Sequence, residues 1–104
     1  MTNFAKQIIN LKTSIEVQKN SIVSKTITTN SNSSLTLFAF DAGQSIAAHT
    51  APVDAVVQVV EGDVRIVISG EEFILKEGEI ILMPKHEPHE LLALSPFKMA
   101  LFKV

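Results

Sequence analysis

Residues 55–83, with the sequence AVVQVVEGDVRIVISGEEFILKEGEIILM, decide the fold of this chain. Short runs rich in valine, isoleucine and leucine follow one another, and a glycine-containing turn separates each run from the next. β-Branched residues favour strands, and a short turn with glycine between two such runs favours a hairpin. The turns are too short for a crossover helix, which needs about a dozen residues. This stretch therefore predicts consecutive short strands without intervening helices.

The same pattern of strands and turns extends to both sides of residues 55–83. Turn signals recur at intervals of roughly 8–12 residues, which is typical of a β-sandwich or β-barrel. We expect strands at residues 21–28, 35–40, 45–49, 55–60, 64–68, 72–75, 80–83, 89–94 and 97–104.

Residues 1–20 have a different pattern. Phe4, Ile8 and Leu11 are spaced as on one face of a helix, which favours a short helix, and the residues that follow are irregular. We therefore expect one all-β domain at residues 21–104. A short irregular or helical segment, residues 1–20, precedes it and packs on the barrel or on a partner.

The composition excludes several classes of function. A chain of 104 residues is one domain, and 46% hydrophobic residues exclude an intrinsically disordered protein. Without cysteine, disulfides, thiol nucleophiles and iron–sulfur ligation are excluded. The net charge of −2, a single arginine and no Trp or Tyr argue against nucleic-acid binding. No apolar run approaches the roughly 18 residues of a membrane span, and no signal peptide is evident, so we expect a soluble cytoplasmic protein.

Gly43, His49 and Gly62 lie at informative intervals, because five residues separate Gly43 from His49 and twelve separate His49 from Gly62. These intervals resemble the first motif of the cupin superfamily, a group of small jelly-roll β-barrels. That motif reads glycine, five residues, His-x-His, three or four residues, glutamate, six residues, glycine. The second histidine position holds Ala51 here, and the glutamate position holds Ala55.

Gly78, Pro84 and His89 resemble the second cupin motif, which reads glycine, five residues, Pro-x-Gly, two residues, histidine, three residues, asparagine. His86 replaces the inner glycine, and Ala93 replaces the asparagine. The resemblance covers residues 20–104 and implies a cupin-type jelly-roll β-barrel.

A complete cupin site implies three histidines and one carboxylate around a divalent transition metal such as iron, manganese, nickel, copper or zinc. This chain keeps His49 and His89 of that set. His86, three residues before His89, is the candidate replacement ligand. The alternative interpretation of His86 is a turn residue at the mouth of the barrel.

Ala51 and Ala55 also predict space inside the barrel, because methyl groups stand where the family has larger polar side chains. If Ala55 faces inward, the strand period of two places Val57 and Val59 on the same face, and Ala47 faces inward on the same reasoning. The predicted pocket is apolar with two imidazoles, and its residues are His49, Ala51, Ala55, Val57, Val59, His89 and Leu91. The alternative is an interior filled by its own side chains.

Strands 55–60 and 97–104 are apolar on both faces, so one face needs a cover outside the barrel. We expect a homodimer packed through an outer sheet face. The alternative is that residues 1–20 alone cover this face.

Three functions agree with these residues. The first is a small cupin that binds a small molecule near His49 and His89. The second is a metal-dependent cupin enzyme of the dioxygenase or isomerase type, with a non-standard ligand set. The third is a structural or interaction protein with a filled barrel.

Overall fold

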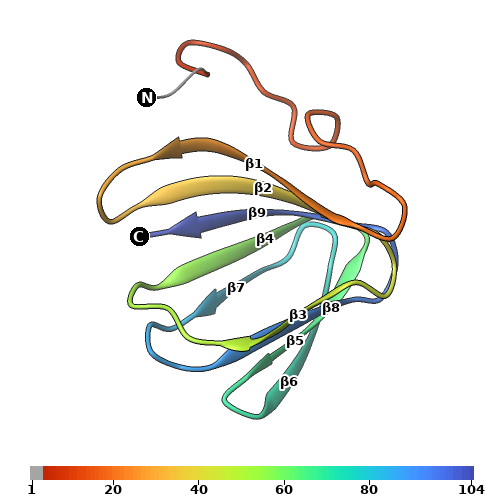
Figure 1. The fold of residues 1–104 in the computed structure, drawn as a ribbon, viewed down its shortest axis with the longest axis vertical. Helices are drawn as coiled ribbons and strands as arrows, with labels where there is room; N and C mark the ends of the chain where they lie inside the picture. The colour runs from red at the N-terminus through yellow and green to blue at the C-terminus, as the bar shows by residue number, and fades with distance from the viewer. Residues whose placement is uncertain (1–3) are drawn as a thin grey trace.

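The computed structural model describes residues 4–104, which form two antiparallel sheets packed face to face (Figure 1). One sheet has five strands in the order β1-β2-β9-β4-β7, and the other has four in the order β3-β8-β5-β6. The strands are β1 (Ile22–Thr29), β2 (Ser34–Phe40), β3 (Ser45–His49), β4 (Ala55–Glu61), β5 (Asp63–Ile68), β6 (Glu71–Lys76), β7 (Ile80–Met83), β8 (His89–Ala93) and β9 (Phe97–Lys103). The all-β prediction is therefore confirmed. No helix of the described residues is long and apolar enough to span a membrane.

The segment before β1 is irregular over its described residues 4–21, which is the irregular one of the two predicted alternatives. The side-chain carbonyl of Asn10 accepts hydrogen bonds from the backbone N–H groups of Lys12 (2.9 Å) and Thr13 (3.2 Å). Such a local bond offers the backbone an alternative to helical hydrogen bonding. The segment's apolar residues in the outer-face cluster, Ile9, Leu11, Ile15 and Val17, do not fall on one face of a helix, because successive residues of a helix are turned by about 100°.

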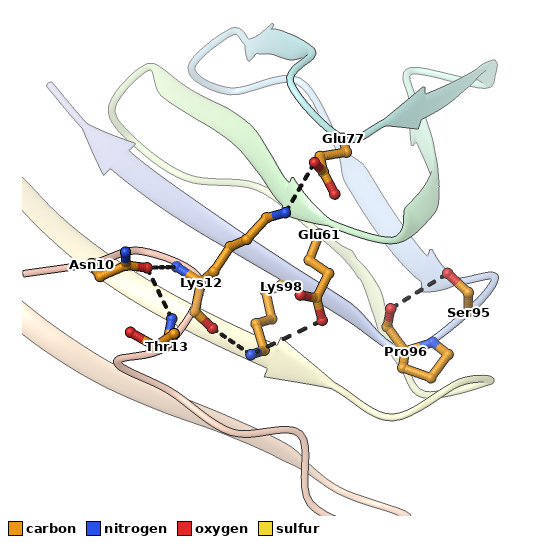
Figure 2. A network of polar contacts seen from close by, with 8 residues as sticks. All are labelled: Asn10, Lys12, Thr13, Glu61, Glu77, Ser95, Pro96 and Lys98. Carbon is orange, nitrogen blue, oxygen red and sulfur yellow. Dashed lines mark hydrogen bonds and ion pairs between the residues drawn. The ribbon is translucent and has the colours of Figure 1, made fainter.

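Two lysines hold this segment on the barrel (Figure 2). Nζ of Lys98, on β9, donates a hydrogen bond to the carbonyl oxygen of Lys12 (2.5 Å) and lies 4.0 Å from the carboxylate of Glu61. Nζ of Lys12 lies 3.1 Å from the carboxylate of Glu77. Lys98 is buried, so its ammonium group needs these oxygen atoms in place of water.

The N-terminal segment covers part of the outer face of the five-stranded sheet. Ile15 packs there with Leu37, Ala39, Val60 and Ala100, which are all buried. The segment thus supplies the cover that the apolar strands require, but only in part. The outer face of β7 stays open, because Ile80 is 65% exposed and Leu82 is 52% exposed.

The core lies between the two sheets and is filled by large side chains. Those with the least exposure are Phe40, Phe97, Leu37, Ile66, Val57, Val59 and Val64; all but Leu37, which faces the N-terminal segment, belong to this core. The rings of Phe40 and Phe97 meet edge to face with their centroids 5.3 Å apart. Gly62, in the turn from β4 to β5, has φ +79°, and a Cβ atom there would lie 2.1 Å from the carbonyl oxygen of Pro96. This turn therefore requires glycine.

Several strands begin or end at one end of the barrel, on the left in Figure 1. β3 ends at His49, and β8 begins at His89. β4 begins at Ala55, and β9 ends at Lys103. Residues far apart in the sequence are thereby gathered at this end.

Candidate functional site

A bulge in β3 decides which of its side chains enter the barrel. Ile46 pairs with Leu91 and His49 pairs with His89, so β3 contains one residue more than β8 between the two pairs. The extra residue reverses the alternation, and Ile46 and His49 both face the interior. Ala47 is exposed on the outside. The prediction that Ala47 faces inward was therefore wrong, because it assumed an unbroken period of two.

His49 and His89 lie against each other across the β3–β8 pair, with ring centroids 4.4 Å apart and planes at 66°. Nδ1 of His49 lies 3.0 Å from the carbonyl oxygen of Ala47, and Nδ1 of His89 lies 3.2 Å from that of Glu87. A carbonyl oxygen only accepts hydrogen bonds, so Nδ1 carries the proton in both rings. In a neutral ring with this tautomer, the Nε2 lone pair is left available to a ligand.

His89 is buried, with 5% of its surface exposed. Burial lowers the pKa of His89 below its usual range. The hydrogen bond to the carbonyl of Glu87 raises this pKa, whereas the positive charges of His49 and Lys103 lower it further. His89 is therefore held in its neutral form, in which Nε2 accepts a hydrogen bond.

A cavity of about 290 Å³ opens beside the two imidazoles. It is lined by Phe38, Ile46, His49, Thr50, Ala51, Pro52, Ala55, Met83, His89, Leu91, Met99, Leu101 and Lys103. The structure thus brings together five of the seven predicted pocket residues. Val57 and Val59 face inward as predicted but do not line the cavity, since they lie further along β4, in the filled core.

Lys103 lines the cavity, although it is not among the pocket residues predicted from the sequence. Lys103 pairs with Ala55 across β9 and β4, so both side chains lie on the inner face of the sheet. The signal was the alternation of strand 97–104, in which residue 103 has the same parity as Phe97 and Leu101. The sequence predicted strand 97–104 as apolar on both faces, although the parity of residue 103 places this lysine at the open end of the interior.

His86 does not join the histidine pair. It is exposed, has φ +67° and does not line the cavity. Its backbone N–H donates to the carbonyl oxygen of Ala51 (2.8 Å), which joins two loops at the cavity mouth. Asp54 contacts the same loop, since its Oδ1 accepts the N–H of Lys85 (2.9 Å).

Within residues 4–104, no group of three or more His, Asp or Glu side chains could hold a metal ion. A catalytic zinc site, for comparison, has three protein ligands and an open position. His49 and His89 provide two donors, and the methyl groups of Ala51 and Ala55 provide none. The side chains present therefore do not fit a metal centre of three protein ligands.

Residues 36–103 match the family model described as a cupin domain. Among curated proteins, no sequence matches this chain. Solved structures, in contrast, do match this chain. A conserved Streptococcus pyogenes protein of unknown function is 31% identical, with a TM-score of 0.91 over 95% of this chain and 87% of that one.

Two further structures resemble the chain. A cupin 2 conserved barrel domain protein from Leptotrichia buccalis is 37% identical, with a TM-score of 0.89 over 92% of this chain but only 47% of that one. The salicylate 1,2-dioxygenase of Pseudoaminobacter salicylatoxidans, in a structure of its adducts with gentisate, is 26% identical. Its TM-score is 0.66, over 69% of this chain and 20% of that one.

Proposed function

The chain belongs to the cupin family, and we propose that it binds a small, largely apolar molecule in the cavity beside His49 and His89. The observation that carries this proposal is the hollow end of the barrel. Ala51 and Ala55 line the cavity there, with Leu91 on the opposite sheet. Small barrels either fill with their own side chains or enclose one small ligand, and alanine at two lining positions favours the second.

The size and lining of the cavity indicate the kind of ligand. About 290 Å³ lies at the lower end of the range for small-molecule sites, which starts near 300 Å³. Most lining side chains are aliphatic or aromatic, and the few polar ones include two imidazoles on one wall. An apolar wall binds the body of a ligand, and a few placed polar groups orient it. The free Nε2 atoms of the imidazoles accept hydrogen bonds from a hydroxyl or amide of the ligand.

A metal-dependent enzyme of the dioxygenase or isomerase type is the alternative. The two free Nε2 atoms favour it, as does the similarity to one part of a dioxygenase. The lack of a third protein ligand next to the pair, among the residues that the structure describes, argues against it. Elemental analysis of tag-free protein separates the two functions. About one metal ion per chain, lost in His49→Ala or His89→Ala, supports the enzyme, whereas no bound metal supports the binding protein.

The direct test fills the cavity. We expect small aromatic and aliphatic probes to shift the NMR amide signals of Ala55, His89 and Leu91 in the wild-type protein. Ala55→Leu adds three carbons inside the cavity and should abolish these shifts. Ala51→Leu, at the mouth, is the second variant in case Ala55→Leu folds poorly. Ala47→Leu makes the same change on the outside of β3 and should bind like the wild type. The proposal would be contradicted if Ala55→Leu and Ala51→Leu bound the probes as tightly as the wild type does. It would also be contradicted if the wild-type protein bound no probe.

We also propose that the uncovered outer face pairs with a second copy of the chain. Leu82, Val56, Phe102 and Leu35 are successive neighbours across β7, β4, β9 and β2, which makes one apolar row on the outer face. Closed homodimers bury one patch of each copy against the same patch of the other. An uninterrupted apolar row with Leu82 at its exposed end is suited to such pairing.

Light scattering during size-exclusion chromatography tests the dimer. Wild-type protein should elute with twice the mass of 11.4 kDa, and Leu82→Lys should shift the population to the monomer. Leu94→Lys is the matched control, because Leu94 is an exposed leucine outside the row. A wild-type monomer at tens of micromolar, or a Leu82→Lys dimer, would refute this interface.

A further inference from the structure

Lys103 places a positive charge at the mouth of the cavity. It is the last residue of β9 and lies between Ala55 of β4 and Ser34 of β2. Its side chain lines the cavity and also a groove of about 330 Å³ outside it, formed by residues 29–34 and 51–53. Lys103 is therefore at the boundary between the apolar interior and the solvent.

This charge has no acidic partner in the part of the chain that the structure describes. Lys12, Arg65 and Lys98 each lie within 4.0 Å of a glutamate, whereas no such contact is present for Lys103. None of the thirteen residues that line the cavity is acidic. The charge of Lys103 acts on the interior, since it lowers the pKa of the buried His89. Among the described residues, the cavity lining thus carries a lysine and no acidic side chain.

We infer that the cavity selects an organic anion, a carboxylate with a compact apolar body, whose carboxylate lies at Lys103. This inference rests on the proposed binding function and adds the charge of the ligand to it. The apolar body packs against Ala55, Leu91 and Leu101, which are on the inner walls. The ammonium group of Lys103 meets the carboxylate at the mouth.

The position of the charge at the mouth makes this arrangement favourable. A carboxylate in a dry interior loses its hydration, at a large penalty. Lys103 and Thr50 line the cavity and are exposed to solvent, so a carboxylate beside them keeps part of its hydration shell. An amine in the same place meets the like charge of Lys103 and finds no carboxylate. The arrangement therefore discriminates among ligands of one shape by their charge.

Benzoate, benzamide and benzylamine test the inference, because they share a ring and differ in charge at pH 7.5. We expect wild-type protein to bind benzoate about three- to five-fold more tightly than benzamide, the upper range for a solvent-exposed ion pair. Benzylamine should bind most weakly. The measurement is an NMR titration that follows the amide signals of Ala55 and Leu91 at low salt, since salt screens exposed charges.

Variants of Lys103 identify the source of the preference. Lys103→Met keeps much of the apolar stem and removes the charge. The affinity for benzoate should therefore fall to the affinity for benzamide, and the affinity for benzamide should stay unchanged. Lys103→Arg should keep the preference. Lys76→Met is the control, because it removes one positive charge from an exposed site on β6 that does not line the cavity.

The outcomes separate this inference from the proposed function. If wild-type protein binds benzoate and benzamide equally, or if Lys103→Met keeps the preference, the selection by Lys103 is refuted and the binding function stands. If no probe of any charge binds, the proposed function itself is refuted, and this inference with it.

Discussion

The two ends of the barrel interior are built by the same pair of sheets, yet one is filled and the other is hollow. At the filled end, Phe40 and Phe97 meet edge to face, with Val64 among the side chains that are fully buried with them. At the hollow end, Ala55 and the two imidazoles line a cavity of about 290 Å³. Alternation along the strands, together with the bulge in β3 at the hollow end, determines which side chains face inward. The size of these side chains determines whether the interior is a core or a binding site.

The largest expected effect tests this contrast through stability. Phe97→Ala removes a fully buried ring from the filled end and should lower the free energy of unfolding by about 3–5 kcal/mol. Ala55→Leu should destabilise by less than the roughly 1–3 kcal/mol of ordinary overpacking, because its added carbons enter existing space. Urea denaturation followed by circular dichroism measures both values. If Ala55→Leu lowers the free energy of unfolding more than Phe97→Ala does, the hollow end is in fact packed and the contrast between the two ends is wrong.

A smaller effect is expected from pH, through His89 at the hollow end. The pKa of His89 is lowered in the folded protein, so the unfolded chain binds more protons as the pH falls below about 6.5. The stability that neutral His89 contributes is present above that pH and is lost as the pH falls through the lowered pKa. The slope should stay below about 1.4 kcal/mol per pH unit, the limit for one proton.

The measurement compares free energies of unfolding at pH 7.5 and 5.5 in the wild type and two variants. His89→Gln should flatten the dependence on pH, because the buried titrating group is gone. His86→Gln should leave it unchanged, since His86 is exposed and does not line the cavity. An identical dependence in His89→Gln and the wild type would assign the titration to other groups.

The strands could be predicted because glycine, proline and alternation mark their limits. The predicted strands 45–49 and 80–83 coincide with β3 and β7, and the predicted 72–75 is one residue shorter at each end than β6. For residues 1–20 the sequence left an irregular and a helical alternative open, and the helical one came from the spacing of Phe4, Ile8 and Leu11; over residues 4–20 the structure shows the irregular one. In the structure, the Asn10 side chain forms a turn there, and the Lys98 ammonium binds the carbonyl of Lys12. Such a distant contact has no signature in a local pattern.

The candidate site was predicted less completely than the fold. His49, His89, Ala51 and Ala55 could be predicted through the resemblance to the two cupin motifs, which the spacing of Gly43, Gly62 and Gly78 carries. The bulge in β3 was not, because the sequence SIAAH contains neither glycine nor proline to mark it. The direction of the His86 side chain could not be predicted either, since a side chain in a turn follows no period. The inward position of Lys103 could have been predicted from its parity in strand 97–104, but it was overlooked.

The position of β9 in the five-stranded sheet has a consequence for synthesis of the protein. β9 lies between β2 and β4, so residues 97–103 join a hairpin made near the start of the chain to strands made in its middle. A ribosome completes the other four strands of this sheet before it makes the one that connects them. Until then β2 and β4 both present unpaired edges, which are the sites where nascent chains associate wrongly. A chain truncated before residue 97 keeps most of its strands and still lacks the centre of the sheet.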